Sequence, residues 1–416
     1  MRKPALLIAA VAAALMALVP LGMSEAATVP APHQISLRVP FSRALTSARV
    51  GHIAGVVPPL GRHVSPRRLA AAACAEPNCN LTYHGGVVQS SPHVYLLLWG
   101  PNWPNTDPVY GDLSRLYSGL GTASDTWSTV SSQYGPAFSG TVFAGTWQDT
   151  SSPPSDVTPA DLSAEASAFA SAVSITGNTN AQVVIASQHG TCFSDGFAGS
   201  CGSPQPSGFY CGWHDYNGNV PYTNLPYTLD AGQLCGQNWI NKGSSGLTDG
   251  VSTIAAHEYA ETATDPEPAS GWTDNADTIS GGEIGDKCAW GGSNWSTLGS
   301  DTYGNITLPT GTFAMQSLWS NAAGRCLLTT HPTLSITKPP AQLTHRNHRV
   351  HLQIHASTNT GAKITFHASG LPTGLHISTS GLITGTATKL GTWTPKVTAS
   401  TYAGSKSTSF TWRVVR

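Results

Sequence analysis

Two apolar runs bounded by turn-forming residues predict buried strands in the first part of the chain. One covers residues 94–99, between Pro92 and Gly100, and the other covers residues 182–186. Short runs rich in Val, Leu and aromatic residues are typical of strands that are covered on both faces.

Helical periodicity predicts two helices. Thr158, Pro159 and Asp161 mark the start of the first, because Thr is a capping residue, Pro fits the first turn and the acid completes a capping box. The apolar stripe that follows has helical spacing and consists of Leu162, Ala166, Phe169, Ala170 and Val173. A second helix is predicted over residues 250–264, and Asp265-Pro266 should end it because a residue before proline avoids the helical region.

The pattern changes after Pro332. Gly turns with Thr, Ser and Val replace the helix signals, and apolar residues alternate with polar ones at Ile354, Ile364, Phe366, Ile377, Ile383, Val397 and Phe410. We therefore predict a small all-β sandwich after a domain of mixed strands and helices.

The first residues have the features of a signal peptide. Arg2 and Lys3 precede an apolar run that is cut short at Pro20, and small residues precede Ala27. We expect residues 1–26 to be removed and the protein to be secreted, extracellular or attached to the cell surface, with no membrane span after removal.

Three segments follow the predicted signal peptide. Residues 27–73 are expected to be a basic linker or propeptide, residues 74–330 the mixed domain, and residues 333–416 an immunoglobulin-like β-sandwich. The basic segment shows little periodicity and is not expected to fold alone. If it is a propeptide, Arg67-Arg68 is the predicted cut, and its positive charge could cover an acidic cleft until then.

Composition excludes some partners and indicates disulfides. Charged residues make up 10% of the chain and the formal net charge is −1, so nothing favours binding to nucleic acid or to a lipid surface. Eight cysteines behind a signal peptide favour disulfides. Proximity along the chain suggests the pairs Cys74 with Cys79, Cys192 with Cys201, Cys211 with Cys235, and Cys288 with Cys326.

His257, Glu258 and Glu261 lie in the second predicted helix and carry the candidate chemistry. Residues i and i+4 project from one face of a helix, so His257 and Glu261 can hold one cation while Glu258 stands beside it. H-E-x-x-H helices hold zinc in this way and present a base to its water, with Glu replacing the second His here. The motif predicts Glu258 as the catalytic residue in a zincin-like α+β domain, whose mixed sheet packs against this helix.

A third ligand is needed for a zinc hydrolase. Glu283 is the predicted choice, because Ile284 after it would face the core and turn the carboxylate toward the cleft. Asp286 would then orient a ligand or serve as an alternative ligand, and Asp265 is a weaker candidate for either role.

The predicted ligand charge affects both the metal and its reactivity. His257, Glu261 and Glu283 would formally neutralise a divalent cation, which leaves bound water less acidic than at a site with two His and one Glu. Zinc (Zn²⁺) is the expected cofactor, although oxygen-rich ligands also admit Ca²⁺ or Mn²⁺. Tyr210 and His214 are candidate oxyanion or substrate contacts if the fold brings them near.

Several ordered motifs resemble the EXORDIUM or phosphate-induced protein family of plants and its bacterial relatives. They are residues 81–88, 94–100, 210–214, 256–266 and 283–288. The resemblance implies a secreted, cell-wall or extracellular protein with a zincin-like helix, and its matching positions are His257, Glu258, Glu261, Glu283 and Asp286. It supplies no enzymatic activity. Growth signalling, with which the plant family is associated, does not carry over because the basic segment and the β domain depart from the plant pattern.

A second resemblance concerns the C-terminal domain. Residues 371–377 and 381–387 resemble the immunoglobulin-like, cadherin-like domains appended to many bacterial surface proteins. This resemblance implies a spacer or adhesion module.

Two functions follow from these predictions. The first is a secreted zinc metallopeptidase that acts on a peptide or protein substrate. The second is a non-catalytic wall or matrix protein with a structural metal site, whose β domain attaches to a cell-wall or matrix polymer. Carbohydrate binding through exposed Trp and Tyr is a third alternative, because 12 Trp are more than a core of this size usually needs.

Overall fold

The structure is a computed structural model, and part of the chain can be described in it. The described residues are 29–37, 39, 54–57, 80–138, 140–197, 210–275, 282–292, 303–330, 333–358, 364–401 and 404–416. The predicted signal peptide and the predicted cut at Arg67-Arg68 lie outside them.

A seven-stranded mixed sheet forms the centre of the N-terminal unit, in the order β1-β5-β4-β6-β8-β7-β2. Its strands are β1 (His33–Ile35), β2 (Ala54–Val57), β4 (His93–Trp99), β5 (Phe143–Asp149), β6 (Ala181–Ser187), β7 (Gly212–Tyr216) and β8 (Pro221–Leu225). The first five strands in this order pair in parallel, β7 is antiparallel to β8, and β2 is antiparallel to β7. The segment predicted as a linker or propeptide therefore supplies the outer strand at each edge.

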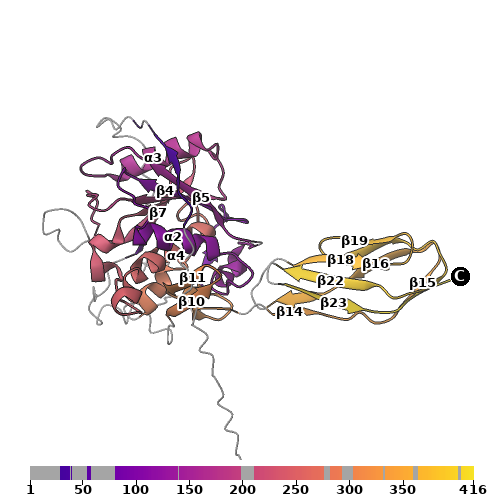
Figure 1. Cartoon of the computed structure of the whole chain (residues 1–416). Helices are drawn as coiled ribbons and strands as arrows, with labels where there is room; N and C mark the ends of the chain where they lie inside the picture. The colour runs from indigo at the N-terminus through magenta and orange to yellow at the C-terminus, as the bar shows by residue number, and fades with distance from the viewer. Residues whose placement is uncertain are drawn as a thin grey trace, which may run out of the picture.

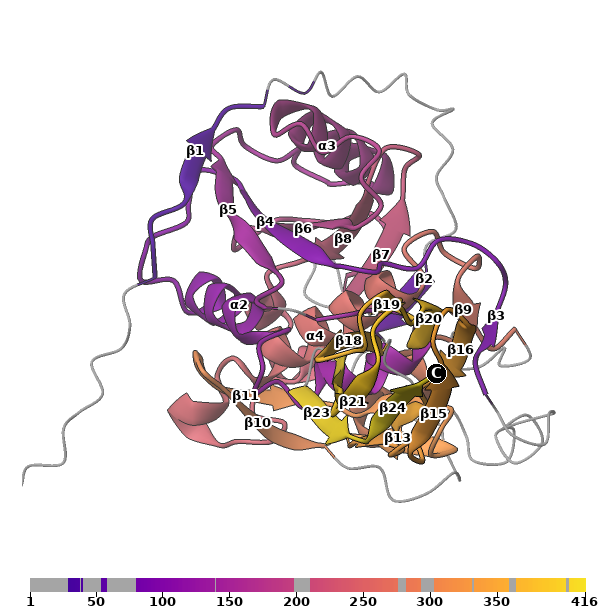
Figure 2. The ribbon, with the colours of Figure 1, turned by 90° about the vertical axis from the view of Figure 1, so that its right-hand side faces the viewer.

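Helices cover both faces of this sheet. Figure 2 shows α3 (Pro159–Ala172) on one face, and α2 (Pro108–Gly119) and α4 (Asp249–Thr264) on the other. Every residue of α4 is buried, because the helix lies between the sheet and the hairpin of β10 and β11. A helix buried all round can place polar side chains in the interior of the domain.

Short elements complete the N-terminal unit. They are β3 (Thr82–Tyr83), η1 (Ser128–Tyr134), η2 (Thr228–Asp230), η3 (Gly232–Cys235), η4 (Gly243–Gly246), β9 (Trp272–Thr273), η5 (Asp286–Gly292), β10 (Gly304–Leu308), β11 (Gly311–Met315), β12 (Leu318–Ser320) and β13 (Arg325–Leu327).

The predicted elements of this unit agree with the structure. The side chain of Thr158 accepts a hydrogen bond from the backbone N–H of Asp161 at 3.2 Å, and Asp161 accepts one from the backbone N–H of Thr158 at 2.9 Å. This is the predicted capping box at the start of α3. The helix α4 ends at Thr264, immediately before Asp265-Pro266, and both predicted strands lie within β4 and β6. The N-terminal region is thus a mixed α/β unit, as expected at that level.

The C-terminal unit is built from strands. These are β14 (Leu334–Ile336), β15 (Gln342–His345), β16 (Arg349–Gln353), β17 (Ala356–Thr358), β18 (Thr365–Ser369), β19 (Leu375–Ile377), β20 (Leu382–Thr386), β21 (Gly391–Trp393), β22 (Lys396–Thr401), β23 (Gly404–Ser409) and β24 (Trp412–Val415). Most pair antiparallel, whereas β15 and β24 pair in parallel.

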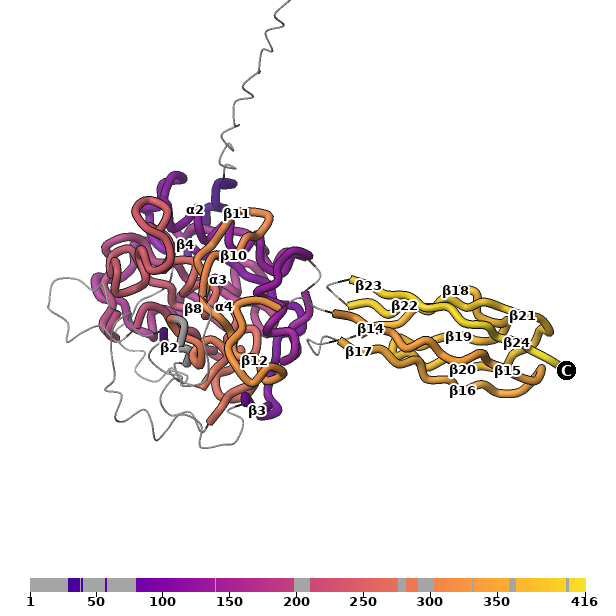
Figure 3. Tube along the Cα trace, turned by 90° about the horizontal axis from the view of Figure 1, so that it is seen from below, coloured from indigo at the N-terminus to yellow at the C-terminus, as the bar shows by residue number. Residues whose placement is uncertain are grey.

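Each unit has its own hydrophobic core. The larger core includes Leu37 and Val57 from the basic segment, together with residues of the sheet and helices. The smaller core is formed by residues such as Ile383, Val397 and Trp412. The two units are seen as separate bodies in Figure 1 and Figure 3. Among the described residues, no helix combines the length and apolar character needed to cross a membrane.

Candidate metal centre

The helix α4 presents His257, Glu258 and Glu261 to the interior of the N-terminal unit. All three side chains have 0% exposure. Nε2 of His257 lies 3.0 Å from Oε1 of Glu261, one turn further along the helix. The convergence expected of residues i and i+4 is therefore present.

The carboxylate of Glu261 is held by the backbone of the loop that precedes η5. Its Oε1 atom accepts hydrogen bonds from the N–H groups of Gly285 at 3.1 Å and Asp286 at 2.8 Å. Its Oε2 atom has no hydrogen-bond partner. One oxygen therefore fixes the carboxylate, and the other remains able to bind a cation.

Glu283 and Asp286 bring two more carboxylates to the same place, with 2% and 1% exposure. Asp286 is the acid beside His257, since its Oδ1 lies 3.6 Å from Nε2 of the imidazole. Ile284 is fully buried, as expected from the sequence. The loop is fixed from behind, because Gln316 donates to the carbonyl of Gly285 at 2.8 Å.

His214 on β7 also belongs to the cluster and is fully buried. Its Nδ1 atom donates to Oε2 of Glu258 at 3.2 Å, and its Nε2 atom lies 3.7 Å from Oε1 of Glu283. The sequence suggested His214 only as an oxyanion or substrate contact. No local signal in the sequence marks it as a ligand, because the pairing of β7 with β8 brings it to the cluster.

The other two sequence candidates have different surroundings. Asp265 accepts hydrogen bonds from the backbone of Ala269 at 2.6 Å, of Ser270 at 3.1 Å and of Gly271 at 2.6 Å. It therefore fixes the turn after α4. The hydroxyl of Tyr210 donates to Asp195, which does not belong to the cluster.

Two overlapping sets of side chains in the described part of the chain have metal-binding spacing. One is His214, Glu261 and Glu283, and the other is His257, Glu261 and Asp286. In each set the candidate ligand atoms lie within 4.8 Å of one another. Glu261 is common to both sets. Glu283 thus belongs to the same candidate ligand set as His214, whereas the sequence predicted it as a ligand together with His257.

Burial sets the protonation of the cluster. It raises the pKa of Glu258 to about 8 and that of Asp286 to about 7. Burial and repulsion from Glu261 raise the pKa of Glu283 well above its ordinary value. For His214, burial lowers the pKa, but the hydrogen bond with Glu258 and the nearby carboxylates outweigh it and raise the pKa to about 9. The cluster therefore favours extra positive charge, as protons or as a cation.

Several buried polar atoms of the cluster lack hydrogen-bond partners, which bears on whether a cation fits there. Nε2 of His214, Nδ1 of His257 and both carboxylate oxygens of Glu283 and of Asp286 are buried without a hydrogen-bond partner. Oε1 of Glu258 is in the same state. Nε2 of His257 has only its ion-pair contacts with Glu261 and Asp286. Buried polar atoms are normally satisfied, and so many orphaned ligand atoms that face one another fit a bound divalent ion.

Disulfides fix the chain on either side of the cluster. Cys211, immediately before β7, is bonded to Cys235 in η3, and Cys288–Cys326 ties η5 to β13, as predicted. Cys192 is also disulfide-bonded. Cys74, Cys79 and Cys201 lie outside the described residues, so their pairing stays a prediction.

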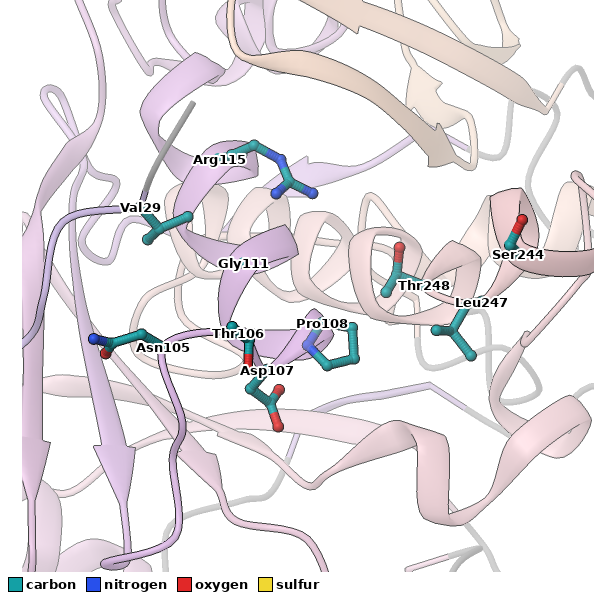
Figure 4. Close-up of a pocket in the computed structure, with 10 residues that line it drawn as sticks. All are labelled: Val29, Asn105, Thr106, Asp107, Pro108, Gly111, Arg115, Ser244, Leu247 and Thr248. Atoms are coloured by element: carbon teal, nitrogen blue, oxygen red, sulfur yellow. The ribbon is translucent and has the colours of Figure 1, made fainter. Parts of the chain in front are cut away.

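A cavity of about 380 Å³ lies away from this cluster, beside the first turns of α2 and α4. Figure 4 shows Arg115, Asp107 and Val29 around it. The carboxylate of Asp107 already caps α2, where it accepts the N–H of Val109 at 2.9 Å, and it also accepts the hydroxyl of Tyr227 at 3.0 Å. The Asp107 carboxylate of this cavity therefore already has hydrogen-bond partners within the protein.

Comparison with known proteins identifies part of the chain. Residues 332–415 match the family described as "Putative Ig domain". The C-terminal unit is an immunoglobulin-like domain. The match covers only this end of the chain, so the resemblance of the N-terminal unit to the EXORDIUM family stays a prediction. No curated protein matches the chain.

Solved structures show only weak likeness to the whole chain. Drosophila N-cadherin EC1-4 is 17% identical, with 26% of this chain and 27% of that chain covered and a TM-score of 0.18. A SusE-like surface located polysaccharide binding protein from Bacteroides thetaiotaomicron is 15% identical, with 26% of this chain and 17% of that chain covered and a TM-score of 0.18. The chain thus spans 27% and 17% of the lengths of these two proteins.

Proposed function

We propose that this protein is a secreted, metal-dependent peptidase of zincin-like type, with zinc as its cofactor. The observation that carries the proposal is the buried cluster of two imidazoles and four carboxylates around α4, in which several possible ligand atoms have no hydrogen-bond partner. The helix lies against a mixed sheet, which supports a zincin-like domain. The ordered motifs shared with the EXORDIUM family support an extracellular location.

His257 and Glu261 would hold the metal from one face of α4. The third ligand would be Glu283, in the loop before η5, or Asp286, at its first residue, because both have oxygens without a hydrogen-bond partner. A set rich in carboxylates also suits Ca²⁺ or Mn²⁺. Bound zinc would supply Lewis acidity, which polarises a substrate carbonyl and makes water a stronger acid.

Glu258 would act as the general base and then as the general acid. Oε1 of this residue has no hydrogen-bond partner, and Oε2 is held by Nδ1 of His214. Oε1 would take a proton from the attacking water as its oxygen bonds to the peptide carbon. The proton would then pass to the leaving nitrogen as the C–N bond breaks. Burial raises the pKa of Glu258 to about 8 in the protein alone. A cation bound beside it would lower this pKa and favour the carboxylate that accepts a proton.

The second candidate function is a non-catalytic extracellular protein with a structural ion and an adhesion-type β domain. Burial favours it: the exposure of the six cluster side chains ranges from 0% to 2%. Structural metal sites are closed, whereas catalytic sites keep an open position.

One substitution separates the two functions. Glu258→Gln keeps the size of the side chain and does not change the proposed ligands. We expect metal content to be retained and cleavage of a protein substrate to fall by at least about a hundredfold. The peptidase proposal fails if the wild-type chain, loaded with zinc and freed of residues 27–68, cleaves no protein substrate.

A further inference from the structure

A short strand from early in the chain lies beside the elements that carry the buried cluster. The strand β2, from the basic segment after the predicted signal peptide, packs against β7, α4 and η5. These three elements carry His214, the H-E-x-x-E motif and Asp286. The strand next to the site thus comes from the part of the chain predicted as a linker or propeptide.

We propose that the free edge of β7 is a binding site for an extended polypeptide, and that β2 occupies it until the basic segment is removed. The inference rests on the proposed function, since it names the substrate class of that site and the way in which the site is kept closed. The edge of β7 would therefore pair with β2 before the basic segment is removed, and with a strand of the substrate afterwards.

The strand β2 pairs with the outer side of β7 through the backbone. The strand β2 is antiparallel to β7, with Ala54 opposite His214 and Val57 opposite Gly212. The N–H of Cys211 donates to the carbonyl of Val57 at 2.7 Å. Without β2, β7 would be an edge strand, and edge strands bind extended peptides through main-chain hydrogen bonds that do not depend on sequence.

The register of this pair places Ala54 of β2 opposite His214 of β7. His214 belongs to the metal-binding cluster, and residues directly opposite each other in an antiparallel pair have Cα atoms about 4.5 to 5.5 Å apart. The backbone at Ala54 is therefore next to the cluster. A substrate in the same register would place a peptide bond there, beside Glu258.

The strand β7 packs closely against α4 at Gly212. A Cβ atom on Gly212 would lie 2.7 Å from Cγ2 of Ile254 and 3.2 Å from Oε1 of Glu258. The strand β7 therefore approaches α4 as closely as a glycine allows, and its paired neighbour lies near the same helix. Val57, the residue of β2 opposite Gly212, has 0% exposure and belongs to the main hydrophobic core.

The rest of the basic segment fits temporary occupation. It carries Arg38, Arg43, Arg49, Arg62, Arg67 and Arg68 and no acid between residues 28 and 72. Arg67-Arg68 in this segment is the predicted cut that would release it. The pairing of β2 with β7 is irregular between Ala54 and Val57, which makes it weaker than a continuous ladder.

The test uses peptide added in trans. The probe is a fluorescent peptide of residues 51–60, and binding is followed by anisotropy for the full exported chain, for Val57→Asp and for Ile35→Asp. The Asp at position 57 would be buried and should release β2, whereas Ile35 lies on β1 at the opposite edge of the sheet. We expect Val57→Asp to bind the peptide with a Kd at least about tenfold lower than wild type or the Ile35→Asp control.

A second preparation carries no substitution. The full chain is cleaved after Arg68 and separated from the released segment, and it should bind the same peptide. This preparation decides the question if Val57→Asp does not fold. Release of metal to a chelator should also be faster for both opened forms than for wild type.

The possible failures can be told apart. If neither opened form binds the peptide while both keep the metal content of wild type, the inference is wrong and the proposed metal site stands. If wild type holds no metal, the proposed function is wrong, and peptide binding alone still decides whether β2 occupies a binding edge.

Discussion

Nε2 of His257 lies 3.0 Å from Oε1 of Glu261, and that oxygen also accepts two backbone N–H groups from the loop before η5. The loop therefore fixes the orientation of the carboxylate without using Oε2. Since Glu261 belongs to both candidate ligand sets, it is the residue on which metal binding should depend most.

Glu261→Gln tests this dependence. The amide keeps the shape of the side chain but removes its charge, so the affinity for zinc should fall by at least about tenfold. Competition with a chromophoric chelator measures the affinity. Glu267→Gln, on a half-buried residue outside both ligand sets, is the matched control and should bind zinc as wild type does. Equal affinity in all three proteins would exclude Glu261 as a ligand.

Gly285→Ala tests how closely the loop and the helix fit. A Cβ atom there would lie 2.9 Å from both Oε1 of Glu261 and Nδ1 of His257, so one of them must shift. We expect weaker zinc binding, with a loss of stability on the order of 1–3 kcal/mol. Thermal unfolding with and without zinc measures both effects. Gly140→Ala meets nothing within 4 Å and should change neither quantity.

Glu165 should make stability depend on pH. It is buried in α3, and burial, with the nearby Asp149 carboxylate, raises its pKa from 4.5 to about 9. Between these values the folded protein holds a proton that the unfolded chain has lost. The free energy of unfolding should therefore fall as pH rises from about 4.5 to about 9.

Glu165→Gln removes this dependence, because the amide does not ionise. Its stability relative to wild type should rise with pH, by a total on the order of a few kcal/mol at pH 9. Urea unfolding at several pH values measures the difference. The idea is wrong if the difference stays constant over the range, or if Glu267→Gln shows the same rise.

Local patterns explain which elements could be predicted. The capping box at Thr158 and the Asp265-Pro266 stop depend on neighbouring residues alone, and both ends were predicted correctly. The H-E-x-x-E spacing likewise predicted that His257 and Glu261 project from the same face of a helix, which agrees with their 3.0 Å contact. The outer strands β1 and β2 were not predicted, because each is short and depends on a partner strand far along the chain.

The rest of the site depends on tertiary contacts. His214 reaches the cluster because β7 pairs with β8 and lies against α4, which no spacing in the sequence reveals. The choice between Glu283 and Asp286 beside His257 depends on how the loop turns around Gly285. The sequence could supply the acids of this loop but not their orientation.

Elemental analysis of the purified full chain is the most direct test of the central claim. We predict at least about one equivalent of a divalent metal per chain, with zinc first, that is lost on prolonged chelation and regained on adding zinc. A full chain that is folded, holds no zinc, calcium or manganese, and takes up none when they are supplied would contradict the account.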